Sequence, residues 1–216
     1  MMATAVNVAL PSLARTFDVP FAAVQWVVLG YLVTTAALLP VVGRLADMVG
    51  KRAIFLTGFA IYALGSLATG LAPSLGALIT FRLIHGVGSA ILTGLGLAIV
   101  TDVFPPNERG RAIGITGSLL SIGIVLGPTL GGLLVQIGWR WVFLSGVPLA
   151  LVGLVLAAAF VPQYPAGVRQ RFDLVGAALL MVLLASGSLA LTLAPEVGAS
   201  SVTLWLLIAV VGLGVP

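Results

Sequence analysis

Apolar residues along this chain run in long blocks, each close to the length that a membrane-crossing helix needs. The hydrocarbon core of a bilayer is about 30 Å thick, and a helix of about 20 apolar residues crosses it. Short segments rich in proline, glycine and charge separate the blocks. The blocks predicted as spans are residues 1–14, 22–42, 53–72, 75–103, 110–135, 142–161, 173–194 and 202–216. The pattern therefore predicts an all-α membrane protein, a polytopic helical bundle.

The first and last blocks are shorter than a full span. Residues 1–14 provide too few positions, and the last block reaches Pro216 while still apolar. A helix that is too short leaves polar backbone groups in lipid, where nothing satisfies them. We therefore expect this chain to be part of a larger transporter or channel.

Composition supports the membrane assignment and excludes several classes of function. The chain is 60% hydrophobic and 7% charged, which is too little polar surface to coat a soluble protein of this size. Lys and Arg number 10 against 6 Asp and Glu, but no basic face with interleaved aromatic residues indicates nucleic-acid binding. With one histidine and no cysteine, nucleophilic triads and metal sites have almost no material. We expect no enzyme activity, no metal and no cofactor.

Basic residues are unevenly divided between the two sides that alternating spans define. If the first span runs outward, seven lie in cytoplasmic segments and two, Arg15 and Arg140, in outer segments. Because basic residues favour the cytoplasmic side, this bias predicts the orientation. The seven are Arg44, Lys51, Arg52, Arg109, Arg111, Arg169 and Arg171. Tryptophan is typical of membrane interfaces. Those predicted at outer span ends are Trp26, Trp139, Trp141 and Trp205.

Arg82 lies inside the apolar block at 75–103. A charge within a membrane helix costs about 2.5–3.5 kcal/mol on insertion scales, so a compensating interaction is expected. The functional interpretation is an arginine that faces a water-filled cavity and pairs with substrate, a carboxylate or backbone carbonyls. The alternatives are an arginine that snorkels to the outer interface or one held in a static polar contact. Since arginine does not titrate, in a proton cycle it would act on a neighbouring group.

His85 follows Arg82 by three residues and lies on nearly the same helix face. Histidine titrates near neutral pH, so His85 is a candidate pH-sensitive element. The more ordinary interpretation is a neutral histidine that makes one interhelical hydrogen bond. No Asp or Glu is evident in the interior of a predicted span, since Asp102 and Asp173 stand at span ends.

Small residues recur every four positions in two predicted spans. This spacing creates a smooth face that a neighbouring helix can approach closely, either as static packing or as a sliding surface. The residues are Gly86, Ala90, Gly94 and Ala98 in the fourth span, and Gly123, Gly127 and Gly131 in the fifth.

The stretch GIVLGPTLGG, residues 123–132, adds a proline to the second of these faces. Pro128 removes a backbone donor and crowds the preceding turn, while flanking glycines relieve that crowding. The helix is thus expected to bend at Gly127 and Pro128, and physics alone does not separate a functional bend from a fixed kink.

The stretch GRLADMVGKR, residues 43–52, concentrates charge in a loop between two apolar blocks. Positive-inside bias accounts for Lys51 and Arg52 but not for Asp47, since acidic residues contribute little to topology. A carboxylate in a tight loop can pair with Arg44 and face the N-terminal end of a neighbouring helix.

Together these stretches resemble the major facilitator superfamily, specifically its drug:proton antiporter branch with fourteen spans (EmrB/QacA-type). GRLADMVGKR is similar to the signature between spans two and three, and FRLIHGVGSA to the fourth-span signature around a membrane arginine. GIVLGPTLGG is similar to the fifth-span antiporter signature, and TAVNVALPSL, which contains Asn7 and Pro11, to the end of the first-span signature. GWRWVF, residues 138–143, also fits this branch. In the first signature an acidic residue usually stands where Met2 is, and in the fourth Gln is common at the place of His85.

The resemblance implies a domain organisation. Residues 1–161 would form the N-terminal six-span half, its first span incomplete. Residues 162–216 would form a cytoplasmic linker and two extra linking spans, the last one truncated. A C-terminal six-span half would complete the transport path, because these transporters bind substrate at the midplane between two halves.

The resemblance also implies roles for the candidate residues. A cytoplasmic gate loop would be formed by Gly43, Arg44, Asp47, Gly50, Lys51 and Arg52. Arg82 and His85 would serve coupling or cavity polarity. Sliding or bending of the antiporter helix would involve Gly123, Gly127, Pro128, Gly131 and Gly132.

The sequence thus predicts an integral protein of a bacterial-type inner membrane that exports amphipathic organic compounds in exchange for protons. The lipid bilayer, a small organic substrate and protons are its expected partners, and the proton gradient is its driving force. The alternatives are a metabolite or sugar transporter of the same superfamily and a non-transporting remnant.

Overall fold

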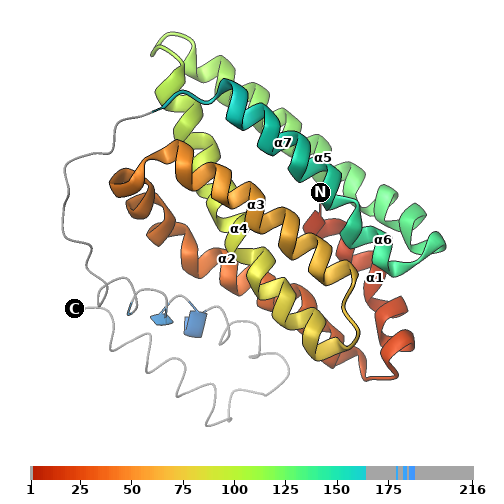
Figure 1. The fold of residues 1–216 in the computed structure, drawn as a ribbon. Helices are drawn as coiled ribbons and strands as arrows, with labels where there is room; N and C mark the ends of the chain where they lie inside the picture. The colour runs from red at the N-terminus through yellow and green to blue at the C-terminus, as the bar shows by residue number, and fades with distance from the viewer. Residues whose placement is uncertain (1, 164–178, 180–181, 184, 188–216) are drawn as a thin grey trace.

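The structure, a computed structural model, describes residues 2–163 together with 179, 182, 183 and 185–187. Within these residues the chain is helical, and its helices are connected by short turns (Figure 1). The helices are α1 (Met2–Phe17), α2 (Phe21–Val49), α3 (Lys51–Gly70), α4 (Leu75–Val103), α5 (Arg109–Ile137), α6 (Trp139–Leu144) and α7 (Gly146–Phe160). The linker and the two further predicted spans, with Arg169, Arg171 and Trp205, lie outside the described residues apart from isolated positions.

Among the described residues, five helical segments are long and apolar enough to cross a membrane. They are α2, α3, α4, α5 and the combined run of α6 and α7, Trp139–Phe160. Their positions confirm the predicted spans to within a few residues, except that α2 extends beyond its apolar block. Helix α1 has 16 residues and is about 24 Å long, shorter than the bilayer core.

The helices pack as an antiparallel bundle in which α4 lies between α2 and α3 (Figure 1). Helix α1 packs on α5, and α7 packs on α3. Buried apolar residues form two clusters, and the larger joins α1, α2, α4 and α6 around Leu13, Val24, Leu78 and Phe143. The second cluster, around Ala46 and Leu95, joins α2 and α4 nearer their other ends.

Close helix contacts depend on small residues, as the four-residue spacing predicted. A Cβ on Gly86 would lie 3.1 Å from the carbonyl oxygen of Tyr31, and one on Gly94 would lie 3.4 Å from Leu39. Ala90 is completely buried in the cluster that includes Val42 of α2. The small face of α4 is therefore the surface on which α2 rests.

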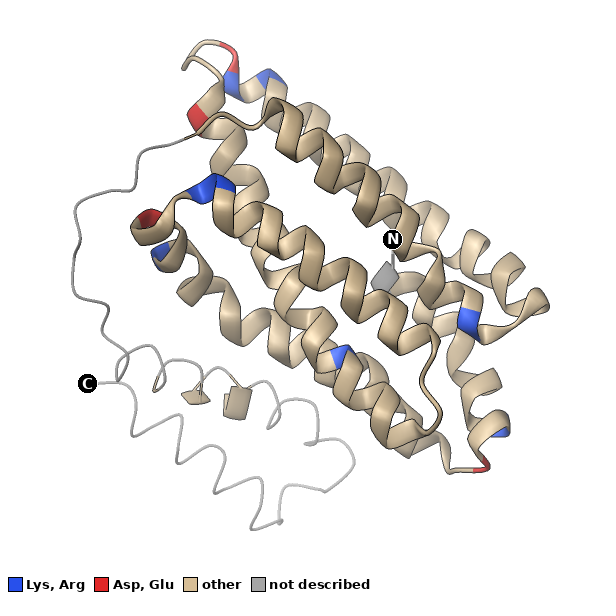
Figure 2. Cartoon of the chain, viewed as in Figure 1, with Lys and Arg blue, Asp and Glu red and all other residues tan. Residues whose placement is uncertain are grey.

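Charged residues gather near the two ends of the bundle (Figure 2). One end, called the charged end below, carries residues from the α2–α3 and α4–α5 connections. These residues are Arg44, Asp47, Lys51, Arg52, Asp102, Glu108, Arg109 and Arg111. The opposite end carries Arg15, Asp18 and Arg140. The basic residues predicted to share a side do so wherever the structure describes them.

The prediction of a loop over residues 43–52 is wrong, because the connection is much shorter. Helix α2 continues to Val49 and α3 begins at Lys51, so Gly50 is the only residue between them. Gly50 has φ 107°, a conformation that side chains disfavour and glycine adopts readily. Because one glycine reverses the chain, the charged residues can remain helical outside the apolar block.

Trp139 stands at a span end, as predicted, but packs inside the bundle. Its side chain is 5% exposed, and its ring centroid lies 5.6 Å from that of Phe17 and 6.0 Å from that of Phe143. The turn at Gly138, with φ 154°, directs Trp139 into the bundle, whereas Trp141 is 52% exposed.

Candidate functional site

Arg82 lies completely buried on α4, among residues of α2 and α6. Its Nε donates to the carbonyl oxygen of Val27 at 3.1 Å. Its guanidinium carbon lies 4.1 Å from the centroid of the Tyr31 ring and 5.6 Å from that of Phe143. Two aromatic faces and a carbonyl thus surround the cation, and each of these interactions is attractive. Contact with a backbone carbonyl fits both the functional interpretation and the static polar contact, whereas complete burial does not fit an arginine that snorkels to the interface.

His85 is the side-chain hydrogen-bond partner of Arg82. The Nη1 atom of Arg82 lies 2.9 Å from Nδ1 of His85, one turn along the same helix. The histidine ring packs edge-on against Tyr62 at 4.1 Å and lies 5.5 Å from Tyr31. This hydrogen bond lies within α4, whereas the sequence suggested an interhelical hydrogen bond for a neutral histidine.

Neighbouring helices hold this cluster in place through small and hydroxyl residues. A Cβ on Gly65 of α3 would lie 2.7 Å from the Cα of His85, so glycine is needed for α3 to approach here. The hydroxyls of Tyr31 and Ser89 share a hydrogen bond of 2.6 Å. The Ser66 hydroxyl donates to the carbonyl oxygen of Phe143 at 2.6 Å. The Tyr31 side chain is thus connected to α4 through Ser89, and the backbone of Phe143 is connected to α3 through Ser66.

Sequence reasoning missed the aromatic and hydroxyl members of the cluster. Tyr31 and Tyr62 account for two of the three tyrosines in the chain, and both fall inside predicted spans. A hydroxyl in an apolar block needs a partner, and this signal could have indicated Tyr31 and Ser89. Nothing in the sequence indicated that Phe143 would face Arg82.

Arg82 has no ion-pair partner within 4 Å among the described residues. Two polar atoms of the cluster, Nη2 of Arg82 and Nε2 of His85, are buried and make no hydrogen bond there. No group of acidic or histidine side chains in the described part could hold a metal ion. The site can therefore donate hydrogen bonds to an acceptor, and it retains an uncompensated positive charge.

At the charged end, Lys51 forms the principal ion pair. Its Nζ lies 2.6 Å from Oδ2 of Asp102 and 4.0 Å from Oδ1 of Asp47. The predicted pairing of Asp47 with Arg44 is wrong, since neither ion pair in the described residues includes Arg44. Asp47 and Lys51 lie across the Gly50 turn, which brings lysine rather than arginine to the carboxylate. The Asp47 side chain is 70% exposed.

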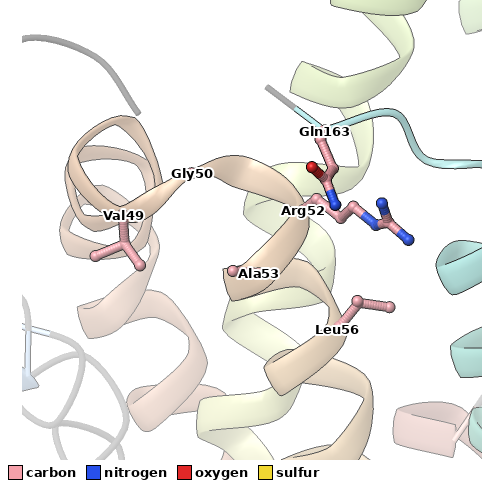
Figure 3. A pocket seen from close by; sticks show the side chains of 6 residues that line it. All are labelled: Val49, Gly50, Arg52, Ala53, Leu56 and Gln163. Carbon is pink, nitrogen blue, oxygen red and sulfur yellow. The ribbon is translucent and has the colours of Figure 1, made fainter. Parts of the chain in front are cut away.

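A pocket of about 410 Å³ opens beside the Gly50 turn (Figure 3). Its lining residues are Val49, Gly50, Arg52, Ala53, Leu56 and Gln163. Arg52 also donates from Nη2 to the carbonyl oxygen of Ala158 at 2.7 Å, which connects α3 to the end of α7. Val49 and the Arg82 partner Val27 both lie on α2, about 33 Å apart at the helical rise per residue. The pocket and the Arg82 cluster are therefore separate sites.

Helix α5 continues through Pro128 without a break in its helical assignment. Gly127 and Gly131 are buried, and a Cβ on Gly131 would lie 2.8 Å from the carbonyl oxygen of Ala5 on α1. A Cβ on Gly132 would meet nothing within 4 Å, while Pro128 is exposed and Gly123 is partly buried. The glycine face is thus a packing surface for α1, and the proline lies away from it.

Asn7 and Pro11, one turn apart on α1, are both exposed. The opposite face of α1 is buried and includes Val6, Ala9 and Leu13. Asn7, Pro11 and the exposed side of α5 therefore belong to a surface that no other described helix covers.

Comparison with known proteins identifies the family. The family description "Major Facilitator Superfamily" matches residues 1–173. The chain belongs to the major facilitator superfamily. It is 41% identical over 199 residues to the multidrug resistance protein Stp of Mycobacterium tuberculosis, covering 91% of this chain and 37% of that protein. It is 36% identical over 158 residues to the riboflavin transporter RibZ of Clostridioides difficile, covering 73% and 35%.

The superfamily fold is also seen in solved structures. A bacterial homologue of the human lysosomal transporter Spinster, in an inward-facing occupied conformation, matches with a TM-score of 0.59 and 23% identity. The match covers 94% of this chain and 52% of that protein. This likeness confirms the predicted all-α fold and the arrangement of an N-terminal half. Membership of the superfamily points to membrane transport rather than to catalysis.

The chain spans just over a third of the length of these two curated relatives. Superfamily transporters bind substrate between two halves at the midplane.

Proposed function

We propose that the protein containing this chain is a proton-coupled antiporter that exports amphipathic organic compounds across a bacterial inner membrane. The likeness to Stp, which is named for multidrug resistance, supports this substrate class. The basic residues of the charged end support an orientation in which that end faces the cytoplasm. The proton gradient would drive export, and no cofactor would be needed.

The observation on which the coupling role rests is the buried charge of Arg82. A fixed cation without a carboxylate partner within 4 Å in the described residues favours the deprotonated form of any carboxylic acid brought near it. Arg82 would thereby promote proton release from an acidic group and would donate a hydrogen bond to the resulting carboxylate. Arg82 itself would stay protonated throughout the cycle.

The charged end would act as the cytoplasmic gate. Asp47 is exposed and could face the positive N-terminal end of a helix in the other half. Gly43, Arg44, Gly50, Lys51 and Arg52 would support this contact, which would break when the cytoplasmic side opens. On α5, Pro128 and the glycines from Gly123 to Gly132 would allow bending against the other half and limit proton leak.

The decisive experiment uses the longest open reading frame that contains this chain, expressed in bacteria that lack their own multidrug pumps. Dye efflux should depend on the proton gradient and stop when a protonophore collapses it. Arg82→Ala should abolish gradient-driven efflux at normal membrane abundance, and Arg82→Lys should retain part of it. An Arg82→Ala protein that inserts normally and keeps full efflux would refute the coupling role.

The bend in α5 has its own test. Pro128→Ala should lower transport or raise proton leak in the same cells. Unchanged transport with unchanged leak would reduce Gly127 and Pro128 to packing residues.

A second candidate function is uptake of a metabolite, because RibZ, a riboflavin transporter, is 36% identical over 158 residues. Uptake of a labelled vitamin or sugar without dye export would favour it. Absence of all transport by a well-inserted product of that reading frame would favour the third alternative, a non-transporting remnant.

A further inference from the structure

The hydrogen bond between Arg82 and His85 determines which histidine nitrogen carries the proton. Every polar hydrogen-bonding atom of a guanidinium is a donor, so Nδ1 of His85 must accept from Nη1. The proton of a neutral ring then lies on Nε2. A doubly protonated ring could not accept this bond, and its cation would face the cation of Arg82.

The guanidinium is held by three contacts that point in different directions. Val27 accepts from Nε, His85 accepts from Nη1, and the Tyr31 ring lies beneath the plane. Of these three contacts, only the one with His85 is a hydrogen bond to a side-chain acceptor. After these contacts, Nη2 is the guanidinium nitrogen that has no partner among the described residues.

We propose that His85 is a positioning residue that holds Arg82 in one orientation and keeps Nη2 available to an acceptor. The acceptor class is a carboxylate, whether of the protein or of the substrate. This proposal rests on the proposed function, because it assigns His85 a part in presenting the coupling cation. His85 itself contacts neither the acceptor nor the transported proton.

The surroundings of His85 are compatible with a neutral ring that stays in place. The titratable groups that face it are Tyr62 from α3, Tyr31 from α2 and Arg82 from its own helix. None of these supplies a negative charge, and Gly65 places the α3 backbone directly against it. The ring therefore has a fixed position from which Nδ1 meets the guanidinium.

Two substitutions separate the hydrogen bond from the packing of the ring. His85→Phe keeps an aromatic ring against Tyr62 and Tyr31 but removes the acceptor. His85→Gln removes the ring but supplies an amide oxygen that can accept from Nη1. A purely structural role predicts that Phe is the better replacement, whereas positioning predicts that Gln is.

The first experiment measures transport by the longest reading frame containing this chain in proteoliposomes. We expect His85→Phe to lower the maximal rate at least tenfold with KM changed less than twofold, at unchanged thermal stability. His85→Gln should remain within threefold of the unsubstituted rate. A fully active Phe variant, or a Gln variant as defective as Phe, would overturn the proposal.

The second experiment does not depend on transport and uses this chain directly. His85 is its only histidine, so ¹⁵N-histidine labelling of the chain in nanodiscs gives one assigned pair of ring nitrogens. We expect a neutral ring with the proton on Nε2, and a change in the Nδ1 shift in Arg82→Met. A proton on Nδ1, or no response to Arg82→Met, would overturn the positioning of Arg82 even if antiport were established. If the spectrum is as expected but no proton-driven transport is found, only the proposed function is contradicted.

Discussion

Lys51, the first residue of α3, forms an ion pair of 2.6 Å with Asp102 near the end of α4. The same ammonium group lies 4.0 Å from Asp47 of α2. One lysine thus connects three helices at the charged end. The two carboxylates differ in exposure, since the side chain of Asp102 is 34% exposed and that of Asp47 is 70% exposed.

We expect Asp102→Asn to destabilise the chain and Asp47→Asn to leave its stability unchanged. A partly exposed ion pair contributes up to about 1 kcal/mol, and exposed pairs contribute less. The measurement is the midpoint of thermal unfolding in detergent for both variants. The effect of Asp102→Asn should vanish in a Lys51→Met background, and a loss that persists there would show that the pair is not its cause.

Much of the fold could be predicted from the sequence because the bilayer imposes a simple rule on composition. Helix α4 begins and ends at the predicted residues, since Ser74 caps it and Pro105 and Pro106 follow it closely. Arg82 and the small face from Gly86 to Gly94 stood out because a charge or a regular glycine spacing is informative in an apolar run.

The sequence predicted less well the features that depend on contacts between distant segments. The direction of Trp139 depends on the turn at Gly138, and its partner Phe17 is far away in the chain. The pairing of Lys51 with Asp102 likewise needed the arrangement of α3 and α4. For His85, helical spacing placed it beside Arg82, but the packing of Tyr62 and Gly65 around it needed the three-dimensional structure.

Two adjacent glycines of α5 test whether its small face is needed for contact with α1. A Cβ on Gly131 would lie 2.8 Å from the backbone oxygen of Ala5, whereas one on Gly132 would meet nothing within 4 Å. We expect Gly131→Ala to destabilise the chain by about 1–3 kcal/mol, the usual cost of overpacking. Gly132→Ala should be neutral or stabilising, since alanine favours a helix by about 1 kcal/mol over glycine.

The measurement for this pair is unfolding of each variant in detergent, with helix content followed by circular dichroism. Equal stability of the two alanine variants would mean that α1 moves freely on α5. That outcome would contradict the close contact seen at Ala5.

Two tryptophans separated by one residue test the inward packing of Trp139. Trp139→Ala should destabilise the chain by about 3–5 kcal/mol, because it leaves a cavity between Phe17 and Phe143. Trp141→Ala should have little effect on unfolding, since that side chain is 52% exposed. Tryptophan fluorescence in bilayers with brominated lipids provides a second measurement, in which Trp141 is quenched more than Trp139. Stronger quenching of Trp139 would contradict its packing inside the bundle.

Gly65 tests the connection between helix packing and the Arg82 cluster. A Cβ there would lie 2.7 Å from the Cα and 2.9 Å from the backbone nitrogen of His85. Since backbone atoms cannot swing aside, Gly65→Ala must push α3 away from α4 at the level of His85. We expect a loss of about 1–3 kcal/mol in unfolding free energy and a changed ¹⁵N signal from His85. Gly96→Ala is the matched control, because its Cβ would meet nothing within 4 Å. It should be neutral or stabilising and should leave the histidine signal unchanged. A Gly65→Ala chain with normal stability and an unaltered histidine signal would show that α3 does not hold His85 against Arg82.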